Sequence, residues 1–115
     1  MLYALNVFDI VPGKEVVYKD YSLKAGRIIY GLGGRVISSG RGPEALRGEP
    51  DRKCFILVEF PSREVFQQFH DAATAQDIHL LREASTQHYI WQLFPPWGLK
   101  AWVCASTPEP PASAE

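Results

Sequence analysis

Three histidines, His70, His79 and His88, are the side chains of this sequence best suited to acid–base chemistry at neutral pH. His88 begins the largely apolar stretch HYIWQLF, and Tyr89 follows it directly. A neutral imidazole in that place can take a proton from a phenol or an activated carbon while a tyrosine hydroxyl orients the substrate oxygen. We therefore predict His88 as a catalytic base and Tyr89 or Tyr21 as the orienting hydroxyl. A solvated histidine at a strand edge is the alternative.

The histidine spacing argues against a metal site. His70 and His79 lie about two and a half turns apart on a continuous helix, so their side chains would point in different directions. The sequence contains neither an HExxH nor an HxxxH pattern. Its glycines form neither GxGxxG nor GxxxxGK, the loops that hold nucleotide phosphates. We predict no metal and no organic cofactor, and we place His79 in solvent on its helix.

Several polar or aromatic side chains interrupt apolar segments and are candidate ligand contacts. Asn6 interrupts the first predicted strand, where its amide must find a partner or face a wet cavity. A ligand and a backbone group at a bulge are equally compatible with that position. Tyr18 and Tyr21 lie three residues apart on one side of a predicted helix, where they either pack in the core or line a pocket. Trp91 is both a core anchor and a candidate contact.

The carboxylate of Glu59 is a further candidate. Glu59 alternates with Phe55 and Leu57, which places it on the second face of its strand. A carboxylate buried alone would be costly, so we predict an ion pair with Arg82 or Arg52, and Glu59 and Arg82 both enter the predicted site. If Glu59 were instead unpaired and desolvated, its pKa would rise and it would become a candidate base.

The elements that would position these groups follow from the hydrophobic pattern. Strands are predicted at 2–8, 35–39, 53–60 and 89–94, with a loop rich in glycine, proline and charge at 40–52.

Helices are predicted between these strands. Apolar residues recur at three- and four-residue steps from Val17 to Leu32, and Gly33 with Gly34 ends that helix as a left-handed cap would. Ser62 can cap a second helix whose core face uses apolar residues at 65, 66 and 69. Thr74, with an aspartate three residues on, can cap a further segment.

The order β-α-β-β-α-β predicts an α+β, ferredoxin-like fold, with helices on one face of a four-stranded antiparallel sheet. Phe55 and Leu57 then lie on the sheet face that the helices do not cover. Tyr89, Trp91 and Leu93 are likewise expected to need cover from outside the helical layer. Such a face measures roughly 400 Å², which rivals the largest apolar patch that a monomer tolerates. We predict that two copies pack sheet against sheet as a homodimer.

Composition sets the remaining limits. With 115 residues, 46% of them hydrophobic and 22% charged, the chain is one soluble domain. A net charge of -1 gives no electrostatic footprint for nucleic acid or an anionic membrane. No CxxC pair, secretion signal or membrane-spanning apolar window is visible, so we predict a cytoplasmic protein. The domain is placed at 1–103, with an extra arm from 97 to 103, and a disordered tail at 104–115.

From Tyr3 through Phe94 the sequence resembles the small bacterial domain called DUF1330, within the dimeric α/β barrel superfamily. The matching features are Tyr18 and Tyr21, Gly33-Gly34-Arg35, the LRGEPDR segment from Leu46 to Arg52, VEFPS from Val58 to Ser62, and Leu81-Arg82. The resemblance implies a ferredoxin-like fold that pairs as a dimeric α/β barrel, but it carries no agreed reaction.

Two departures from the family pattern bear on the site. Arg47 precedes Gly48 where relatives usually carry an acidic residue. A role that depends on the carboxylate of the relatives is therefore not carried over to this chain. His70 begins an HDAA stretch where relatives carry an aromatic residue and a DSPEY-like segment. This departure implies a changed pocket at a helix edge and makes His70 a candidate ligand contact.

These observations lead to two hypotheses about function. The first is an enzyme without an organic cofactor that acts on a small apolar or aromatic molecule by cyclisation, isomerisation or lactone opening. The second is a non-catalytic, ligand-binding or stress-associated dimer. Haem handling, found in other branches of the superfamily, is weaker because no histidine has an obvious supporting group.

Overall fold

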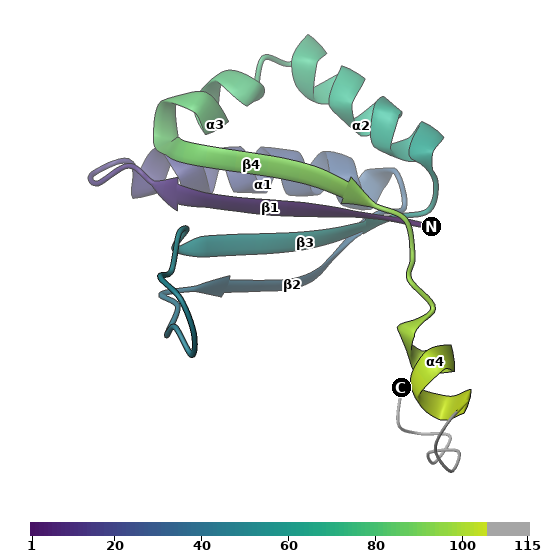
Figure 1. The fold of residues 1–115 in the computed structure, drawn as a ribbon. Coiled ribbons are helices and arrows are strands. Elements are labelled where there is room, and N and C mark those ends of the chain that lie inside the picture. The colour runs from purple at the N-terminus through teal and green to yellow at the C-terminus, as the bar shows by residue number, and fades with distance from the viewer. Residues whose placement is uncertain (106–115) are drawn as a thin grey trace.

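The computed structural model describes residues 1–105, so most of the predicted tail at 104–115 lies outside the described residues. In chain order the elements are β1 (Leu2–Ile10), α1 (Glu15–Gly31), β2 (Arg35–Arg41), β3 (Cys54–Phe60), α2 (Arg63–Ala75), α3 (His79–Ser85), β4 (Thr86–Phe94) and α4 (Leu99–Ala105). Helices α1, α2 and α3 cover one face of the sheet, and α4 extends from the end of β4, away from them (Figure 1).

The four strands form one antiparallel sheet in the order β2-β3-β1-β4. β1 is therefore a central strand, and its Asn6 lies opposite Ile56 of β3 and Trp91 of β4. This order and the single helical layer confirm the predicted ferredoxin-like α+β fold.

Alternation along the strands divides the sheet into a helix-facing side and an open side. Ala4 and Phe8 of β1 are buried under the helices, as are Val58 and Phe60 of β3. Phe60 packs against Phe66 and Phe69 of α2 with ring centroids 5.3 and 5.6 Å apart.

The aromatic residues of β4 also lie under the helices. Tyr89 stacks on Phe8, and Trp91 meets the rings of Phe66 and Phe69 edge-on. Leu93 packs against the same core. The prediction that these β4 side chains lack cover was therefore wrong, because the residues of β4 that alternate with them face the open side instead.

Two of the predicted helix ends are confirmed. The Ser62 hydroxyl accepts a hydrogen bond from the Val65 amide at 3.2 Å, which caps α2. Gly33 follows α1 with φ of 88°, a backbone conformation that side chains with a Cβ rarely adopt.

The predicted cap at Thr74 was wrong. Thr74 lies inside α2, and its hydroxyl donates to the carbonyl of His70. The chain instead turns at Asp77, which has φ of 55°, before α3 begins at His79. Short polar side chains such as aspartate tolerate this left-handed conformation, so the break needs no glycine.

Strand ends extended further than the hydrophobic pattern predicted. β4 begins at Thr86 rather than Tyr89 because polar Thr86 and Gln87 continue the pairing with β1, opposite Ile10 and Asp9. The register shifts between Val7 and Asp9, and His88 has φ of 56° at this irregularity. β1 likewise extends to Ile10 and β2 to Arg41.

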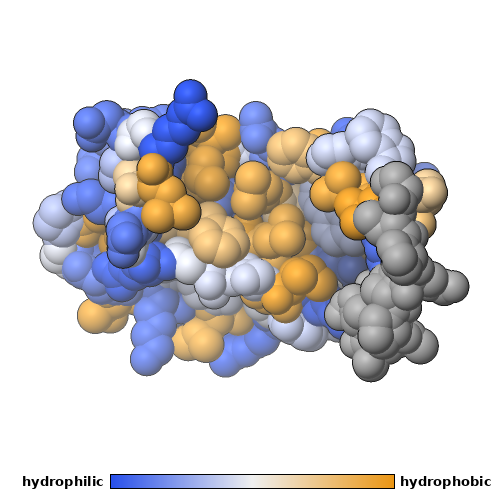
Figure 2. Space-filling model, turned by 60° about the horizontal axis from the view of Figure 1, so that its bottom comes forward, coloured by the Kyte–Doolittle hydropathy of each residue, from blue (hydrophilic) through white to orange (hydrophobic). Residues whose placement is uncertain are grey.

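The open side of the sheet carries apolar side chains that the described chain does not cover (Figure 2). Phe55, Ile37 and Phe94 remain 37%, 41% and 43% exposed. Trp97 and Trp102 pack edge-on against each other near α4 and are 65% and 67% exposed. Within the described residues, the helices are too short or too polar to cross a membrane.

Candidate ligand-binding site

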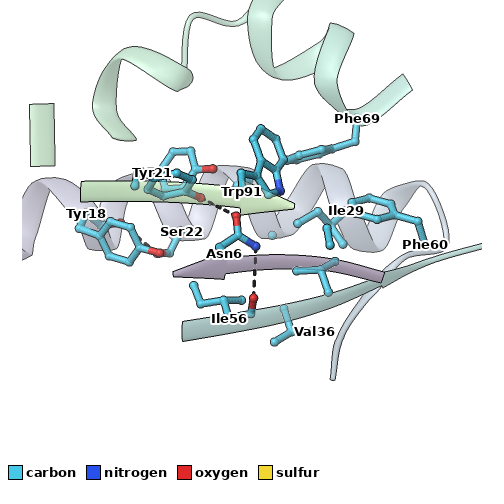
Figure 3. Close-up of a pocket in the computed structure, with 15 residues that line it drawn as sticks. Asn6, Tyr18, Tyr21, Ser22, Ile29, Val36, Ile56, Phe60, Phe69 and Trp91 are labelled. Carbon is cyan, nitrogen blue, oxygen red and sulfur yellow. Dashed lines mark hydrogen bonds between the residues drawn. The ribbon is translucent and has the colours of Figure 1, made fainter. Parts of the chain in front are cut away.

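A small cavity lies between α1 and the helix-facing side of the sheet (Figure 3). Its volume is about 100 Å³, and we call it the inner cavity. Its lining is mainly apolar and consists of Ala4, Asn6, Tyr18, Tyr21, Ser22, Ala25, Gly26, Ile29, Val36, Ile56, Val58, Phe60, Phe69, Tyr89 and Trp91. An enclosure of this size and polarity suits a small molecule with few polar atoms.

Asn6 provides the polar floor of the inner cavity. Its Oδ1 accepts a hydrogen bond from the Tyr89 hydroxyl at 2.5 Å, and its Nδ2 donates to the Ile56 carbonyl at 3.2 Å (Figure 3). The amide therefore has a side-chain partner and a backbone partner, and it lines the cavity as well. The backbone partner is not at a bulge, since Asn6 and Ile56 pair in regular register.

Three tyrosines lie around this floor and are shielded from water. Burial raises the pKa of Tyr18, Tyr21 and Tyr89 above the ordinary value for a phenol. At Tyr21 the positive charge of Arg82 opposes part of that rise. All three therefore remain neutral phenols at physiological pH. A neutral phenol can donate one hydrogen bond, and that of Tyr89 is already made to Asn6, so Tyr18 and Tyr21 are the candidate donors to a ligand oxygen. All three are poorly suited to act as bases.

The indole of Trp91 brings an unused hydrogen-bond donor to the same place. Its Nε1 is buried and has no hydrogen-bond partner within the described chain. Figure 3 shows this nitrogen on the side of the ring that faces Asn6 and the sheet. An unpaired buried donor costs about 1–3 kcal/mol, so it calls for a partner that residues 1–105 do not supply.

A wider opening adjoins the inner cavity at its α1 end. This open groove has a volume of about 630 Å³ and runs between the start of α1 and strands β2 and β3. Tyr18, Ser22 and Ile56 line both spaces, so these three residues form the boundary between the inner cavity and the groove.

His88 does not join this site. Its Nδ1 lies 2.9 Å from Oδ2 of Asp9, and the imidazole side chain is 62% exposed. Asp9 alternates with the helix-facing Phe8, so this pair lies on the open side of the sheet. The structure thus separates His88 from Tyr89 and Tyr21. The expectation that these three share one cavity was wrong because successive residues of a strand point to opposite faces, so Tyr89 faces the helices and His88 faces the open side.

The partner predicted for Glu59 was also wrong. Its carboxylate pairs with Arg35 of the neighbouring strand, with Nε and Oε1 3.0 Å apart. Arg35 lies directly opposite Glu59 in the sheet register, which explains the choice. Arg52 pairs instead with Asp51 and donates to the carbonyl of His88. The ion pair itself was expected, and it leaves Glu59 outside the inner cavity.

His70, His79 and Arg82 meet at a second hollow. This helix-side pocket has a volume of about 200 Å³, and its lining is Tyr21, Phe69, His70, Ala73, Thr74, His79, Arg82 and Trp91. The turn at Asp77 redirects the chain, so the two histidines line one pocket rather than pointing apart. The prediction that His79 is solvated was wrong, since its Nδ1 is buried. Across residues 1–105, no three potential metal ligands come together.

Sequence reasoning missed part of the lining. Ser22, Ala25, Gly26 and Ile29 form the α1 wall of the inner cavity. Their helical spacing was visible, but a core face and a cavity wall have the same period. A glycine within that face was the available signal, because glycine is unfavourable in a helix interior.

The chain matches the model of a domain of unknown function, DUF1330, over residues 3–93. No curated protein matches it. Among solved structures, it is similar to RPA0582, a protein of unknown function from Rhodopseudomonas palustris. The TM-score is 0.72 with 20% identity, covering 84% of this chain and 82% of that one.

A DABB-family protein with a ferredoxin-like fold from Mesorhizobium loti is also similar, with a TM-score of 0.57 and 14% identity over 84% of this chain and 97% of that one. An uncharacterised NIPSNAP domain protein from Burkholderia xenovorans gives a TM-score of 0.56 and 14% identity, with coverage of 84% and 95%. These likenesses agree with the sheet order and the single helical layer. The chain belongs to the DUF1330 family.

Proposed function

We propose that this protein binds a small, mainly apolar or aromatic molecule carrying one oxygen atom, and that the molecule occupies the inner cavity. The observation that carries the proposal is the buried Nε1–H of Trp91, which has no partner within the described residues. A ligand oxygen in the cavity would accept this hydrogen bond, while the apolar lining would cover the rest of the molecule.

The composition of α1 supports access to the cavity. Gly26 lies within the helix and lines the cavity, and a Cβ placed there would meet nothing within 4 Å. Packing therefore does not require glycine, although glycine is less favourable than alanine in a helix by about 1 kcal/mol. A glycine at this position keeps the α1 wall of the cavity wide.

The neutral phenols give this site a route to catalysis. Tyr21 would polarise a carbonyl oxygen or donate a proton to it, which suits isomerisation, cyclisation or lactone opening without an organic cofactor. Tyr89 already donates its proton to Asn6 and would act only after exchanging that hydrogen bond. A base is still required for proton abstraction, and none of the lining side chains of the inner cavity is one. We therefore propose ligand binding as the function of this site. Catalysis there would additionally require a base from outside the cavity lining.

A second candidate is acid–base chemistry on the open side of the sheet. There Asp9 orients His88 through a contact of 2.9 Å, and the exposed imidazole leaves its other nitrogen accessible. A carboxylate that orients an imidazole is a recurrent arrangement of general bases. This candidate requires a substrate on the open side, between two copies of the chain.

A homodimer is part of both proposals. The open side carries Phe55, Ile37 and Phe94 partly exposed, and α4 leaves that side uncovered (Figures 1 and 2). A second sheet placed there would bury these side chains, at about 25 cal/mol for each Å² removed from water before the cost of association. Each copy would keep its own inner cavity, because that cavity lies on the other side of the sheet.

Binding can be tested with phenol as the probe and benzene as the analogue without oxygen. Phenol should shift the indole N–H resonance of Trp91 in ¹H–¹⁵N spectra and leave those of Trp97 and Trp102 unchanged. Phenol should also bind about tenfold more tightly than benzene, as expected for one added hydrogen bond in a buried site.

A matched pair of variants locates the binding. Gly26→Leu should fill the inner cavity and abolish the shift, whereas Gly31→Leu, at the exposed end of the same helix, should preserve it. Equal binding of phenol by both variants would place the ligand elsewhere and reject the proposal.

A further inference from the structure

The helix-side pocket differs from the inner cavity in chemistry. Arg82 and two imidazoles line it, and no carboxylate does. None of the ion pairs in the described part of the chain involves Arg82, so its charge has no acidic partner there. A guanidinium that is partly buried without a carboxylate is unusual, because charged groups removed from water are normally paired.

Aromatic rings hold Arg82 in place. Its guanidinium carbon lies 5.3 Å from the ring centroids of both Tyr89 and Trp91. Stacking of this kind uses the flat faces of the guanidinium and leaves the N–H groups at its edge available. These N–H groups match the two oxygens of a carboxylate in geometry and charge. Arg82 is thus positioned as an anion receptor before any anion arrives.

His79, three residues before Arg82 on α3, adds a second unsatisfied group to the pocket. Its Nδ1 is buried and has no hydrogen-bond partner among residues 1–105, although His79 lines the pocket. An imidazole nitrogen that carries a proton donates to an anion oxygen. His70 stacks on Trp91 at 6.2 Å between ring centroids, with 29° between the planes, and extends the flat aromatic wall.

We propose that the helix-side pocket binds the carboxylate of a small aromatic acid. Arg82 and His79 would hold the carboxylate oxygens, and the ring of the acid would lie against Trp91 and Phe69. A pocket of about 200 Å³ with aromatic walls favours a flat organic acid over a compact inorganic anion, which would leave the apolar wall unused. The proposal does not require a ligand in the inner cavity.

Benzoate is the probe, with benzamide as the neutral analogue of the same shape and inorganic phosphate as the compact anion. Benzoate should bind the wild-type chain and shift the Trp91 indole and Arg82 Nε resonances, while benzamide and phosphate should bind at least tenfold more weakly. Comparable binding of benzamide would remove the role of charge. Comparable binding of phosphate would remove the role of the aromatic wall. Either result would overturn the proposal.

The key variant is Arg82→Met, which keeps a long apolar side chain over the rings but removes the charge. It should weaken benzoate binding at least tenfold. Arg63→Met is the matched control, because Arg63 also lies over an aromatic ring, that of Phe66 at 6.0 Å, but outside the pocket. Its affinity for benzoate should equal that of the wild type. Equal benzoate affinity in Arg82→Met and wild type would refute the assignment.

His79→Phe provides a second variant if Arg82→Met unfolds, since it removes the ring nitrogens and should also weaken benzoate binding. The cavity variant Gly26→Leu separates this proposal from the proposed function. It should abolish phenol binding and leave benzoate binding intact. In the wild-type chain, benzoate binding without phenol binding would reject the proposed function, and phenol binding without benzoate binding would reject the carboxylate pocket.

Discussion

Replacing Gly26 by alanine should stabilise the protein. Gly26 lies in the interior of α1, where alanine is more favourable than glycine by about 1 kcal/mol because glycine loses more backbone entropy on folding. The added methyl group would meet nothing within 4 Å, so neither a clash nor a packing gain changes that figure. For a domain of this size, about 1 kcal/mol corresponds to a rise in Tm of roughly 4 °C.

The assay is thermal unfolding by circular dichroism at one fixed protein concentration, because the melting temperature of a dimer depends on concentration. Gly31→Ala is the matched control. Gly31 is the last residue of the same helix, and a Cβ there is equally free of neighbours, but a terminal residue contributes less to helix propensity. We expect its gain to be less than half that of Gly26→Ala. If Gly26→Ala lowered Tm, or gained no more than Gly31→Ala, the view that Gly26 is retained for the width of the cavity would lose its basis.

Four further outcomes test other parts of the structure. In an absorbance titration, Tyr18, Tyr21 and Tyr89 should not ionise below about pH 10, because burial raises their pKa in the folded state. Their contribution to stability is therefore complete below that pH and is lost as the pH rises. Alkaline unfolding and the ionisation of these tyrosines should coincide. The pKa of Asp9 is lowered, chiefly by its hydrogen bond with His88, so its contribution to stability is present above about pH 4 and is lost as the pH falls. In urea unfolding, Asp9→Asn should therefore be less stable than the wild type at pH 6, by under about 1 kcal/mol. The two should be equally stable near pH 2. Gly34→Ala should destabilise the protein by about 1–3 kcal/mol in urea unfolding, because a Cβ there would lie 2.9 Å from the Ile29 side chain and 3.1 Å from the Glu59 carbonyl oxygen. If the proposed homodimer forms, the wild-type chain should sediment as a dimer in analytical ultracentrifugation and Leu57→Glu, on the open side of the sheet, as a monomer. A wild-type chain that sediments as a monomer would contradict the proposal.

The element order was predictable because it rests on strong local signals. Ser62 after a proline marks the start of α2, and Gly33 marks the end of α1, and both positions hold in the structure. Such signals act within a few residues, so a single sequence is enough to interpret them. The same reasoning assigned Phe55 and Leu57 to the open side of β3, where the structure places them.

The sequence was less informative where a single backbone angle decides the direction of a side chain. At Asp77 a left-handed residue brings His70 and His79 to one pocket. Asp77 is not a glycine, so the pattern contained no mark of this turn. The error at His88 is different, because alternation along the strand already places His88 and Tyr89 on opposite faces of the sheet. Errors in the predicted site therefore arise from one turn and one overlooked alternation rather than from a wrong fold.

Ion-pair partners were unpredictable for a related reason. Glu59 was expected to meet a cation from the loop or the last helix, but its partner is Arg35, which the register of β2 and β3 sets directly opposite. That register shifts between Val36 and Ser38, and a shift of this kind depends on the whole sheet. Arg82, which was one of the two predicted partners of Glu59, has no carboxylate partner among residues 1–105.

Local departures from an optimal fold concentrate around one region of this protein. The indole N–H of Trp91, the Nδ1 of His79 and the charge of Arg82 all lack the partners that buried polar groups require, within the part of the chain that the structure describes. Gly26 is a further unfavourable feature, because only proline has a lower helix propensity than glycine. Elsewhere, comparable groups are satisfied, as the Asn6 amide shows. Groups that lower stability are expected to persist where binding needs them. Ligands should therefore be sought in the space between α1, α3 and β4.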